Sequence, residues 1–465
     1  MSAIELERPI RNPDLDSPPL MTKRARWLVL LGFVLPGSAQ LLAGNRKLGR
    51  FGITATVVLI LAGVLTVVGL LAARADTLTL FTNSWFLFVL TWLLVLYAIL
   101  WLVLGFDTLR LTKLVRVKPN WRVPIAVISV LLTIVPAFGA AWAATTVAST
   151  RGLLDDLFAG APAVEPVKGR YNFLLLGTDA GADREGLRPD SISVVSVDAK
   201  TGQSTIIGVP RELANVPFSK SSPMAKMHPN GFGVGPNEFG EWGGCQVGRC
   251  ILNGVYAEAE LFYPELYPNA KKQHSSPGIE ATKEAVEGAT GLDIQFYVLV
   301  NMDAFSQLID ALGGIEIDVK ERLPIGGDQY QNGVDGWIEP GKQHMNGYTA
   351  QWYARSRYGS AAGDYSRMER QRELQAAILA QMNPTNVLAR FQDIATAGKQ
   401  LVETDIPSSM LGRFVDLAGK SREFPPVNVE LVPPAVDPEN PDFATIQKLV
   451  DQGIVKATPK KEGKQ

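Results

Sequence analysis

The sequence predicts an all-α transmembrane region followed by an extracytoplasmic α/β (α+β) domain in which helices flank a central sheet. Three observations support this fold class. Hydrophobic residues crowd into the first third of the 465-residue chain. The remainder alternates strand-like and helix-like segments, which is typical of a sheet between helix layers. Basic residues flank the apolar runs unevenly, and this asymmetry sets the orientation in a membrane.

Three apolar runs are long enough to cross a bilayer, which takes about 20 apolar residues. They are Phe51–Ala73, Trp85–Phe106 and Pro124–Ser149. The second run is rich in Trp and Tyr, some of them near its ends, where such residues anchor a span at the interface. We therefore expect a transmembrane region over residues 27–149, with spans at about 51–73, 85–106 and 124–149.

A weaker apolar stretch, Trp27–Gly44, precedes these spans and is broken in its middle by Pro36 and Gly37. A secretory signal peptide is the alternative for this stretch, because basic residues come just before it. The three spans that follow favour a re-entrant or interfacial hairpin. Non-helical backbone is tolerated at that depth only where neighbouring spans cover it. Whether residues 27–44 span or re-enter stays open.

Charge predicts the orientation. The loop Asp107–Arg122 is basic, with Arg110, Lys113, Arg116, Lys118 and Arg122. Short basic loops stay in the cytoplasm, so the span after this loop runs outward. The segment before Phe51 and the tail 1–26 are also basic, with Arg46, Lys47, Arg50 and with Lys23, Arg24, Arg26. We expect a multi-pass protein of the cell membrane whose C-terminal domain is extracytoplasmic.

The soluble part should begin after a linker at residues 150–168. Its expected strands are 171–177, 191–197, 204–209, 296–300, 315–319 and 350–357. Its expected helices are 280–290, 303–312 and 365–382, the last one opened by Asp364 as its N-cap. The turn residues 198–202 predict a hairpin between the second and third strands. The main body should cover 169–390 and a further C-terminal part 391–457, before a charged, disordered tail at 458–465.

The chain carries a pair of cysteines, Cys245 and Cys250, in the segment CQVGRC. Outside the cytoplasm such a pair favours a disulfide over a metal site. The three histidines, His228, His274 and His344, lack the spacing of metal ligands. The sequence also has no Ser-His-Asp order and no nucleotide-binding glycine loop. With a net charge of −1 the chain is not generally basic, and nucleic acid is not an expected partner.

Arginines nevertheless gather in the segment ARSRYGSAAGDYSRMERQR. If residues 350–357 form a strand, Arg355 and Arg357 share one face. On the following helix Arg367 and Gln371 are four residues apart and also share a face, with Arg370 beside them. Guanidinium groups this close repel one another unless an anion lies between them, and their planar fork suits phosphate oxygens. A solvated basic face is the alternative.

Two other segments, in which carboxylates lie among arginines, favour an anion site over a solvated basic face. Asp179 follows a buried strand into a loop, the usual position of a functional carboxylate. Arg188 and Asp190 open the next strand on one face, and Arg211 follows the return strand near the same sheet end. Plain ion pairing would explain these residues too. They also fit a magnesium site, because Mg²⁺ prefers one or two carboxylates plus phosphate oxygens and waters.

Several motifs resemble the LytR-CpsA-Psr family of cell-envelope phosphotransferases over roughly Tyr171–Met382. In order, they are FLLLGTD, the Arg-x-Asp of RPDS, VPRE, IDALGGIEIDV, HMNGYTAQWYARSR and GDYSRMERQ. One departure is Glu212, where the family commonly has Asp after the arginine of VPRE; any role of Glu212 is therefore open. The cysteine-containing insertion and the multi-span N-terminus resemble actinobacterial members.

The resemblance implies that residues 169–390 form a catalytic domain that binds a polyprenyl pyrophosphate and its Mg²⁺. The expected catalytic residues are Asp179, Asp190, Arg188, Arg211, Arg355 and Arg357. The expected pyrophosphate ligands are Arg188, Arg211, Arg355, Arg357, Arg367, Arg370 and Gln371, and the expected metal ligands are Asp179 and Asp190. Which carboxylate acts as a base stays open. We also expect an apolar cleft in the sheet–helix core for the isoprenoid chain.

The implied activity is transfer of a glycopolymer from a polyprenyl-pyrophosphate carrier to peptidoglycan. Pyrophosphate transfer needs charge neutralisation and in-line positioning, which arginines, Mg²⁺ and a domain tethered at the membrane supply. A pyrophosphatase would use the same residues with water as the acceptor. The alternative class is a membrane-anchored regulator or a module that binds anionic wall polymer without catalysis. Arabinogalactan, teichoic acid and capsule present the same pyrophosphate, so the polymer stays open.

Overall fold

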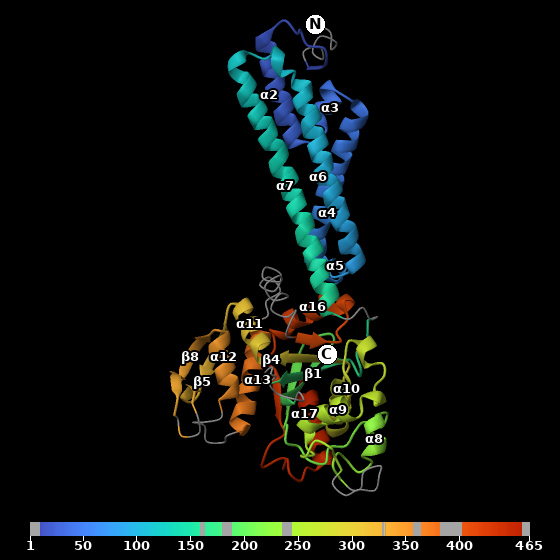
Figure 1. Cartoon of the computed structure of the whole chain (residues 1–465), viewed down its shortest axis with the longest axis vertical. Helices are drawn as coiled ribbons and strands as arrows, with labels where there is room; N and C mark the ends of the chain where they lie inside the picture. The colour runs from blue at the N-terminus through green and yellow to red at the C-terminus, as the bar shows by residue number, and fades with distance from the viewer. Residues whose placement is uncertain are drawn as a thin grey trace, which may run out of the picture. The chain divides into compact units, whose positions relative to one another are not determined.

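The computed structural model describes residues 10–158, 163–178, 188–234, 244–327, 330, 332–356, 364–381 and 402–457. The chain divides into two compact units, Met1–Gly152 and Leu153–Gln465. The first unit is helical, and the second contains the sheets (Figure 1).

The helical unit contains three helices that are long and apolar enough to cross a membrane. They are α4 (Arg46–Ala72), α6 (Ser84–Thr112) and α7 (Pro119–Leu157), with α5 (Arg74–Phe81) between the first two. The three predicted spans are thus confirmed as apolar helices, each longer than its apolar run. Helix α7 continues to Leu157, so the first half of the expected linker is helical.

The predicted break in the first apolar stretch is confirmed. Helix α2 (Pro18–Val34) ends before Pro36, and α3 (Ser38–Ala43) begins after Gly37. Gly37 has a φ of 99°, and a Cβ there would lie 2.4 Å from the carbonyl oxygen of Gly49 in α4. Only glycine permits both this backbone conformation and this approach.

The second unit is built on a mixed six-stranded sheet with the order β10-β3-β2-β1-β4-β9. Its strands are β1 (Arg170–Thr178), β2 (Pro189–Asp198), β3 (Ser204–Val209), β4 (Phe296–Asn301), β9 (Val402–Thr404) and β10 (Val427–Glu430). β1 pairs parallel with β4, and β10 pairs parallel with β3, whereas the other pairs are antiparallel. The C-terminal part expected at 391–457 therefore completes both edges of the central sheet.

Side chains that alternate along the strands face two helix layers. Leu174 and Leu176 of β1 belong to the main core with α9 (Leu252–Phe262), α10 (Pro277–Thr290) and α17 (Phe443–Lys456). Phe173 and Leu175 face the opposite side, toward α13 (Asp364–Gln381) and α16 (Leu411–Ser421). The predicted sheet between helix layers is confirmed.

A smaller subdomain with its own core lies between β4 and α13 in the chain. It contains α11 (Met302–Leu312), α12 (Gly347–Arg355) and two two-stranded sheets, β5 (Ile315–Val319) with β8 (Gly341–Met345), and β6 (Leu323–Gly326) with β7 (Val334–Ile338). The short helix α8 (Pro223–Met227) lies in the long connection after β3.

Most of the predicted elements agree with the structure, including the hairpin of β2 and β3. Its turn is held by Asp198, whose Oδ1 accepts from the amides of Lys200 and Thr201 at 3.0 and 2.8 Å. The strand predicted at 350–357 is wrong for residues 350–355, because they belong to α12. The side chain of Asn346 caps this helix through the amide of Thr349 at 2.9 Å. Ala350, Tyr353 and Ala354 are buried with helical spacing.

Candidate functional site

The site is built around one end of the β2–β3 hairpin. Asp190 is the second residue of β2, and Arg211 lies just beyond the end of β3. Because Ile192 pairs with Val209, the two residues lie side by side, as predicted. The Arg211 Nη1 is 2.5 Å from the Asp190 Oδ1, and Arg211 also reaches Glu212 at 3.5 Å.

Helix α13 brings Arg367 and Gln371 to the same place. Arg367 Nη2 donates to the carbonyl oxygen of Asp190 at 3.4 Å. Gln371 accepts from the hydroxyl of Ser191 at 2.8 Å and donates to the carbonyl oxygen of Ala354 at 3.3 Å. The prediction that these two side chains share a helix face is confirmed, since both line a polar recess with Asp190 and Arg211.

The polar recess also contains a residue to which the sequence assigned no role. Arg372 is 3% exposed and pairs with Glu430 of β10 at 2.7 Å. Its Nε and Nη1 make no hydrogen bond within the described residues. A Cβ on Gly208 of β3 would lie 2.6 Å from Arg372 Nη1, so the glycine makes room for the guanidinium. A glycine inside a buried strand was the available signal.

The other predicted arginines have different surroundings. Arg370 is buried and donates to the carbonyl oxygens of Tyr353 and Ser356 at the end of α12, and it does not line the recess. Arg188 donates to the carbonyl oxygen of Val247 at 3.3 Å. Pyrophosphate contacts for these two arginines stay predictions.

Arg355 lies at the end of a helix and not on the predicted strand. Arg355 is the last residue of α12, and its guanidinium lies 5.8 Å from the centre of the Trp352 ring. The strand conformation expected for Arg355 is therefore wrong, because Arg355 ends a helix. Arg357 and Asp179 lie outside the described residues.

An apolar cavity of about 430 Å³ lies between the sheet and helices α13 and α16. Val195, Val298 and Val300 form its sheet side, and Leu374 and Phe414 come from the helices. This volume is within the range of small-molecule sites. The expected apolar cleft is present. The polar recess and this cavity share Ser191, Gln371 and Gln375 in their walls, so a polar and an apolar site adjoin.

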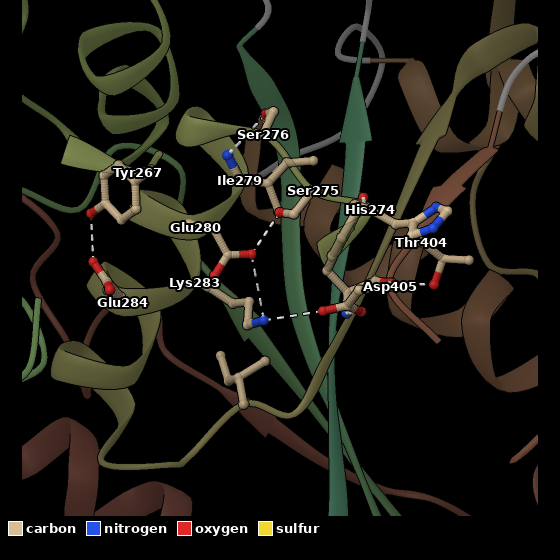
Figure 2. Close-up of polar contacts among 12 residues, drawn as sticks. Tyr267, His274, Ser275, Ser276, Ile279, Glu280, Lys283, Glu284, Thr404 and Asp405 are labelled. Carbon is tan, nitrogen blue, oxygen red and sulfur yellow. Dashed lines mark hydrogen bonds and ion pairs between the residues drawn. The ribbon is translucent and has the colours of Figure 1, made fainter. Parts of the chain in front are cut away.

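A separate network of charged residues lies on α10 and around β9, and Figure 2 shows how its members face one another. The ammonium of Lys283 is 3.1 Å from Asp405 and 3.7 Å from Glu280. Asp405 also accepts from the amide of Tyr297 at 2.7 Å. Burial raises the pKa of Asp405. Because these groups satisfy one another, the network ties β9 to α10 and is not an anion site.

The predicted disulfide is confirmed, with 5.8 Å between the Cα atoms of Cys245 and Cys250. The loop that it closes turns the amides of Gln246 and Val247 toward the carboxylate of Glu258 at 2.8 and 3.1 Å. Glu258 is fully buried, and this burial raises its pKa. The backbone amides of the disulfide loop therefore provide hydrogen bonds to a buried carboxylate.

The site offers few protein ligands for Mg²⁺ among the described residues. Among the described residues, no group of three or more His, Cys, Asp or Glu is arranged to hold a metal ion. Asp190 is the carboxylate in the described lining of the recess, and one of its oxygens already accepts from Arg211. Mg²⁺ needs few protein carboxylates when phosphate oxygens complete its shell. A single carboxylate beside an anion site agrees with that donor set.

The fold and this site define a membrane-anchored α/β protein in which an arginine-lined recess adjoins an apolar cavity. The model of the LytR_cpsA_psr family matches residues 155–435, and the chain belongs to this family. The membership implied by the motifs is thus confirmed.

Individual relatives are more distant. Biofilm regulatory protein A of Streptococcus mutans is 25% identical over 245 residues, 51% of this chain and 50% of that protein. The Bacillus subtilis polyisoprenyl-teichoic acid–peptidoglycan teichoic acid transferase TagV is 33% identical over 137 residues, 29% of this chain and 34% of that protein. The match thus spans half or less of the length of these two relatives. The crystal structure of B. subtilis TagV has a TM-score of 0.43 at 22% identity, covering 63% of this chain and 100% of that one.

Proposed function

We propose that this protein is a membrane-anchored phosphotransferase that moves a glycopolymer from a polyprenyl-pyrophosphate carrier to peptidoglycan. The observation that carries the proposal is the shared wall of the polar recess and the apolar cavity at Ser191, Gln371 and Gln375. A polyprenyl pyrophosphate has the matching chemistry, an anionic group joined to a long apolar chain. The name of the B. subtilis relative, a transferase of polyisoprenyl-linked polymer to peptidoglycan, supports the same substrate class.

Each part of the carrier has a counterpart among the described residues. The pyrophosphate takes the recess, where Arg211, Arg367 and Arg372 offer guanidinium groups. Charge-assisted bonds from a planar fork to phosphate oxygens are stronger than neutral ones. The isoprenoid takes the apolar cavity beside α13. Arg355, Arg357 and Arg188 complete the anion site in this proposal.

The transfer itself is a displacement at phosphorus. The acceptor hydroxyl of peptidoglycan forms a bond to the phosphorus that carries the glycopolymer, and the bond from that phosphorus to the bridging oxygen breaks. Polyprenyl phosphate leaves with the electron pair, and the hydroxyl proton passes to a carboxylate, Asp190 or Asp179. Arginines stabilise the charge on the equatorial and leaving oxygens, which is the main requirement of phosphoryl transfer.

Mg²⁺ is part of the proposal, with Asp190 and Asp179 as its protein ligands. When bound, the ion would neutralise charge on the pyrophosphate oxygens. In this proposal the ion pair with Arg211 also holds the Asp190 carboxylate in the wall of the recess, where the metal ion would bind. Removal of divalent cations with a chelator should lower turnover, and Mg²⁺ should restore it.

The carrier also sets the orientation. We propose that the basic end of the helical unit is cytoplasmic and that the C-terminal domain is extracytoplasmic. In this orientation the C-terminal domain lies on the same side of the membrane as the exported lipid carrier. Labelling of single cysteines introduced at Lys113 and Lys456 in intact cells and inverted vesicles tests this. The two positions should label from opposite sides, and labelling of both from the same side would contradict it.

One experiment separates the candidate functions. Full-length protein extracted in detergent is examined by mass spectrometry for copurifying lipid, and then assayed with a defined polyprenyl-pyrophosphate glycan and peptidoglycan. Phosphodiester-linked product supports transfer. Release of free glycan phosphate without product indicates a pyrophosphatase. Polymer binding that Asp190→Asn leaves intact, with no turnover in the parent protein, indicates a regulator or binding module.

A further inference from the structure

The helical unit contains a groove that the proposed transfer does not use. It has a volume of about 540 Å³ and is lined by Lys23, Arg26, Trp27 and Leu30 of α2, by Lys118 just before α7, and by Trp121 in the first turn of α7. The α2 residues are three or four positions apart and share one face of the helix. This basic groove is held in shape, because the amide of Lys118 donates to the hydroxyl of Thr22 at 3.2 Å.

The groove gathers cations that the described part of the chain does not neutralise. Three other basic side chains at this end have partners: Arg24 donates to the carbonyl oxygens of Ile10 and Leu111, Arg116 pairs with Asp16, and Arg122 donates to the carbonyl oxygens of Val115 and Val117. Lys23, Arg26 and Lys118 have no carboxylate partner among the described residues. The groove therefore attracts an anion.

The groove also continues into an apolar stripe. The guanidinium carbon of Arg26 lies 3.4 Å above the centre of the Trp121 ring, which fixes the charge beside an aromatic wall. Along α2, away from the charged mouth, Leu30, Phe33 and Val34 are 49%, 39% and 68% exposed. In a membrane this stripe contacts acyl chains. A lipid whose headgroup is an anion can therefore fill the groove while its own chain lies along the stripe.

We propose that the basic groove binds the headgroup of an anionic phospholipid. Its phosphate lies among Lys23, Arg26 and Lys118, Trp27 and Trp121 flank the glycerol region, and an acyl chain runs along Leu30 and the apolar residues beyond it. Basic pockets between membrane helices bind such headgroups, and Trp residues favour this interfacial level. The proposal needs the membrane anchor but not the transferase activity. In the orientation proposed above, the lipid belongs to the inner leaflet.

The test uses full-length protein in detergent and native mass spectrometry with added phosphatidylglycerol, with phosphatidylcholine as the neutral comparison. The groove variant is Lys23→Gln/Arg26→Gln/Lys118→Gln. Its matched control is Arg46→Gln/Lys47→Gln/Arg50→Gln, which removes the same charge from exposed positions at the start of α4 that do not line the groove. The parent protein and the control should bind phosphatidylglycerol in preference to phosphatidylcholine. Each cation removed from the groove should weaken phosphatidylglycerol binding about fivefold.

Other results would overturn the proposal. If the groove variant and the control lose phosphatidylglycerol binding equally, binding depends on the total charge of the protein and not on the groove. Displacement of phosphatidylglycerol by millimolar inorganic phosphate would show a site for soluble anions. If the triple variant does not fold, the single variants Lys23→Gln and Lys118→Gln decide, each with an expected loss of about fivefold. The variant Lys23→Arg/Lys118→Arg keeps the charge and should bind as the parent protein does; loss of binding there would also contradict the proposal.

Discussion

Asp190 and Arg211 form an ion pair at the end of the central hairpin, with 2.5 Å between Oδ1 and Nη1. Their side chains are 23% and 18% exposed, so the pair is shielded from water but open to a ligand. The carboxylate orients the guanidinium toward the recess that Arg367 and Gln371 close from α13. The ion pair therefore holds Arg211 at the wall of the recess.

Asp190→Asn should lower polymer transfer about ten- to a hundredfold, because it weakens a charge-assisted bond of roughly 1.5–3 kcal/mol that orients Arg211. The amide is nearly the same size, so copurifying lipid should be retained. Transfer is measured with the defined glycan and peptidoglycan, and activation by Mg²⁺ is titrated in parallel. A weaker response to Mg²⁺ in the variant is the result expected of a lost metal ligand.

The control for this variant should be Lys200→Ala, at the opposite end of the same hairpin. Lys320 also lies outside the recess, but it is unsuitable as a control. Its ammonium lies 2.7 Å from both Glu369 and Glu373 of α13 and thus helps to hold the helix that carries Arg367. Transfer by Asp190→Asn that equals transfer by Lys200→Ala would mean that the cluster is only a basic surface.

The sequence predicted the hairpin and the central strands because apolar runs and turn residues agree there. It failed at residues 350–355 because the aromatic residues Trp352 and Tyr353 favour a strand, whereas the burial of Ala350, Tyr353 and Ala354 and the Asn346 cap favour a helix. Local preference was overruled by packing against the small core of the subdomain.

The site was predictable where it depends on local spacing and unpredictable where it depends on distant partners. Arg367 and Gln371 share a face whatever they contact. Arg372 could not be identified in the same way, because its role depends on Gly208 of β3 and Glu430 of β10, far away in the sequence. Arg370 looked equivalent to its neighbours, but its partners are the carbonyl oxygens at the end of α12.

Gly208→Ala should disturb the recess without touching its charges. The added Cβ would lie 2.6 Å from Arg372 Nη1 and force the guanidinium away from Glu430. Overpacking of this kind typically costs about 1–3 kcal/mol in the free energy of unfolding. Urea unfolding of the full chain in detergent measures the cost, and Arg372→Lys, with a slimmer side chain, should relieve part of it in the double variant. An Ala variant as stable as the parent would contradict this packing.

Val298→Trp should block the apolar cavity, because Val298 lies in its sheet wall and indole is far larger than isopropyl. We expect at least a tenfold loss of copurifying polyprenyl lipid, measured by mass spectrometry, on the order of the 1.4 kcal/mol that one tenfold step represents. Val298→Ala enlarges the cavity and should retain the lipid. Retention by both variants would place the isoprenoid elsewhere.

His228 should make the second unit sensitive to mild acid. It is 5% exposed and packs between Phe218 and Phe232, with ring centres 6.0 and 5.1 Å away. Burial lowers the pKa of His228 from 6.5 to about 4, because the charged imidazole loses its hydration. Between these values the unfolded chain binds more protons than the folded one. Stability is therefore lost as pH falls from 6.5 to about 4, by up to about 3 kcal/mol.

Buried acids act in the opposite direction and must be separated from this effect. Burial raises the pKa of Asp405 and Glu284, so their protonation favours the folded state as pH falls toward their ordinary values. The comparison is therefore between the parent protein and His228→Phe, which keeps an aromatic ring that cannot titrate. Urea unfolding at about pH 7 and about pH 4.5 should show the parent losing about 2–3 kcal/mol more than the variant. Equal losses would mean that His228 is charged in the folded protein or open to water.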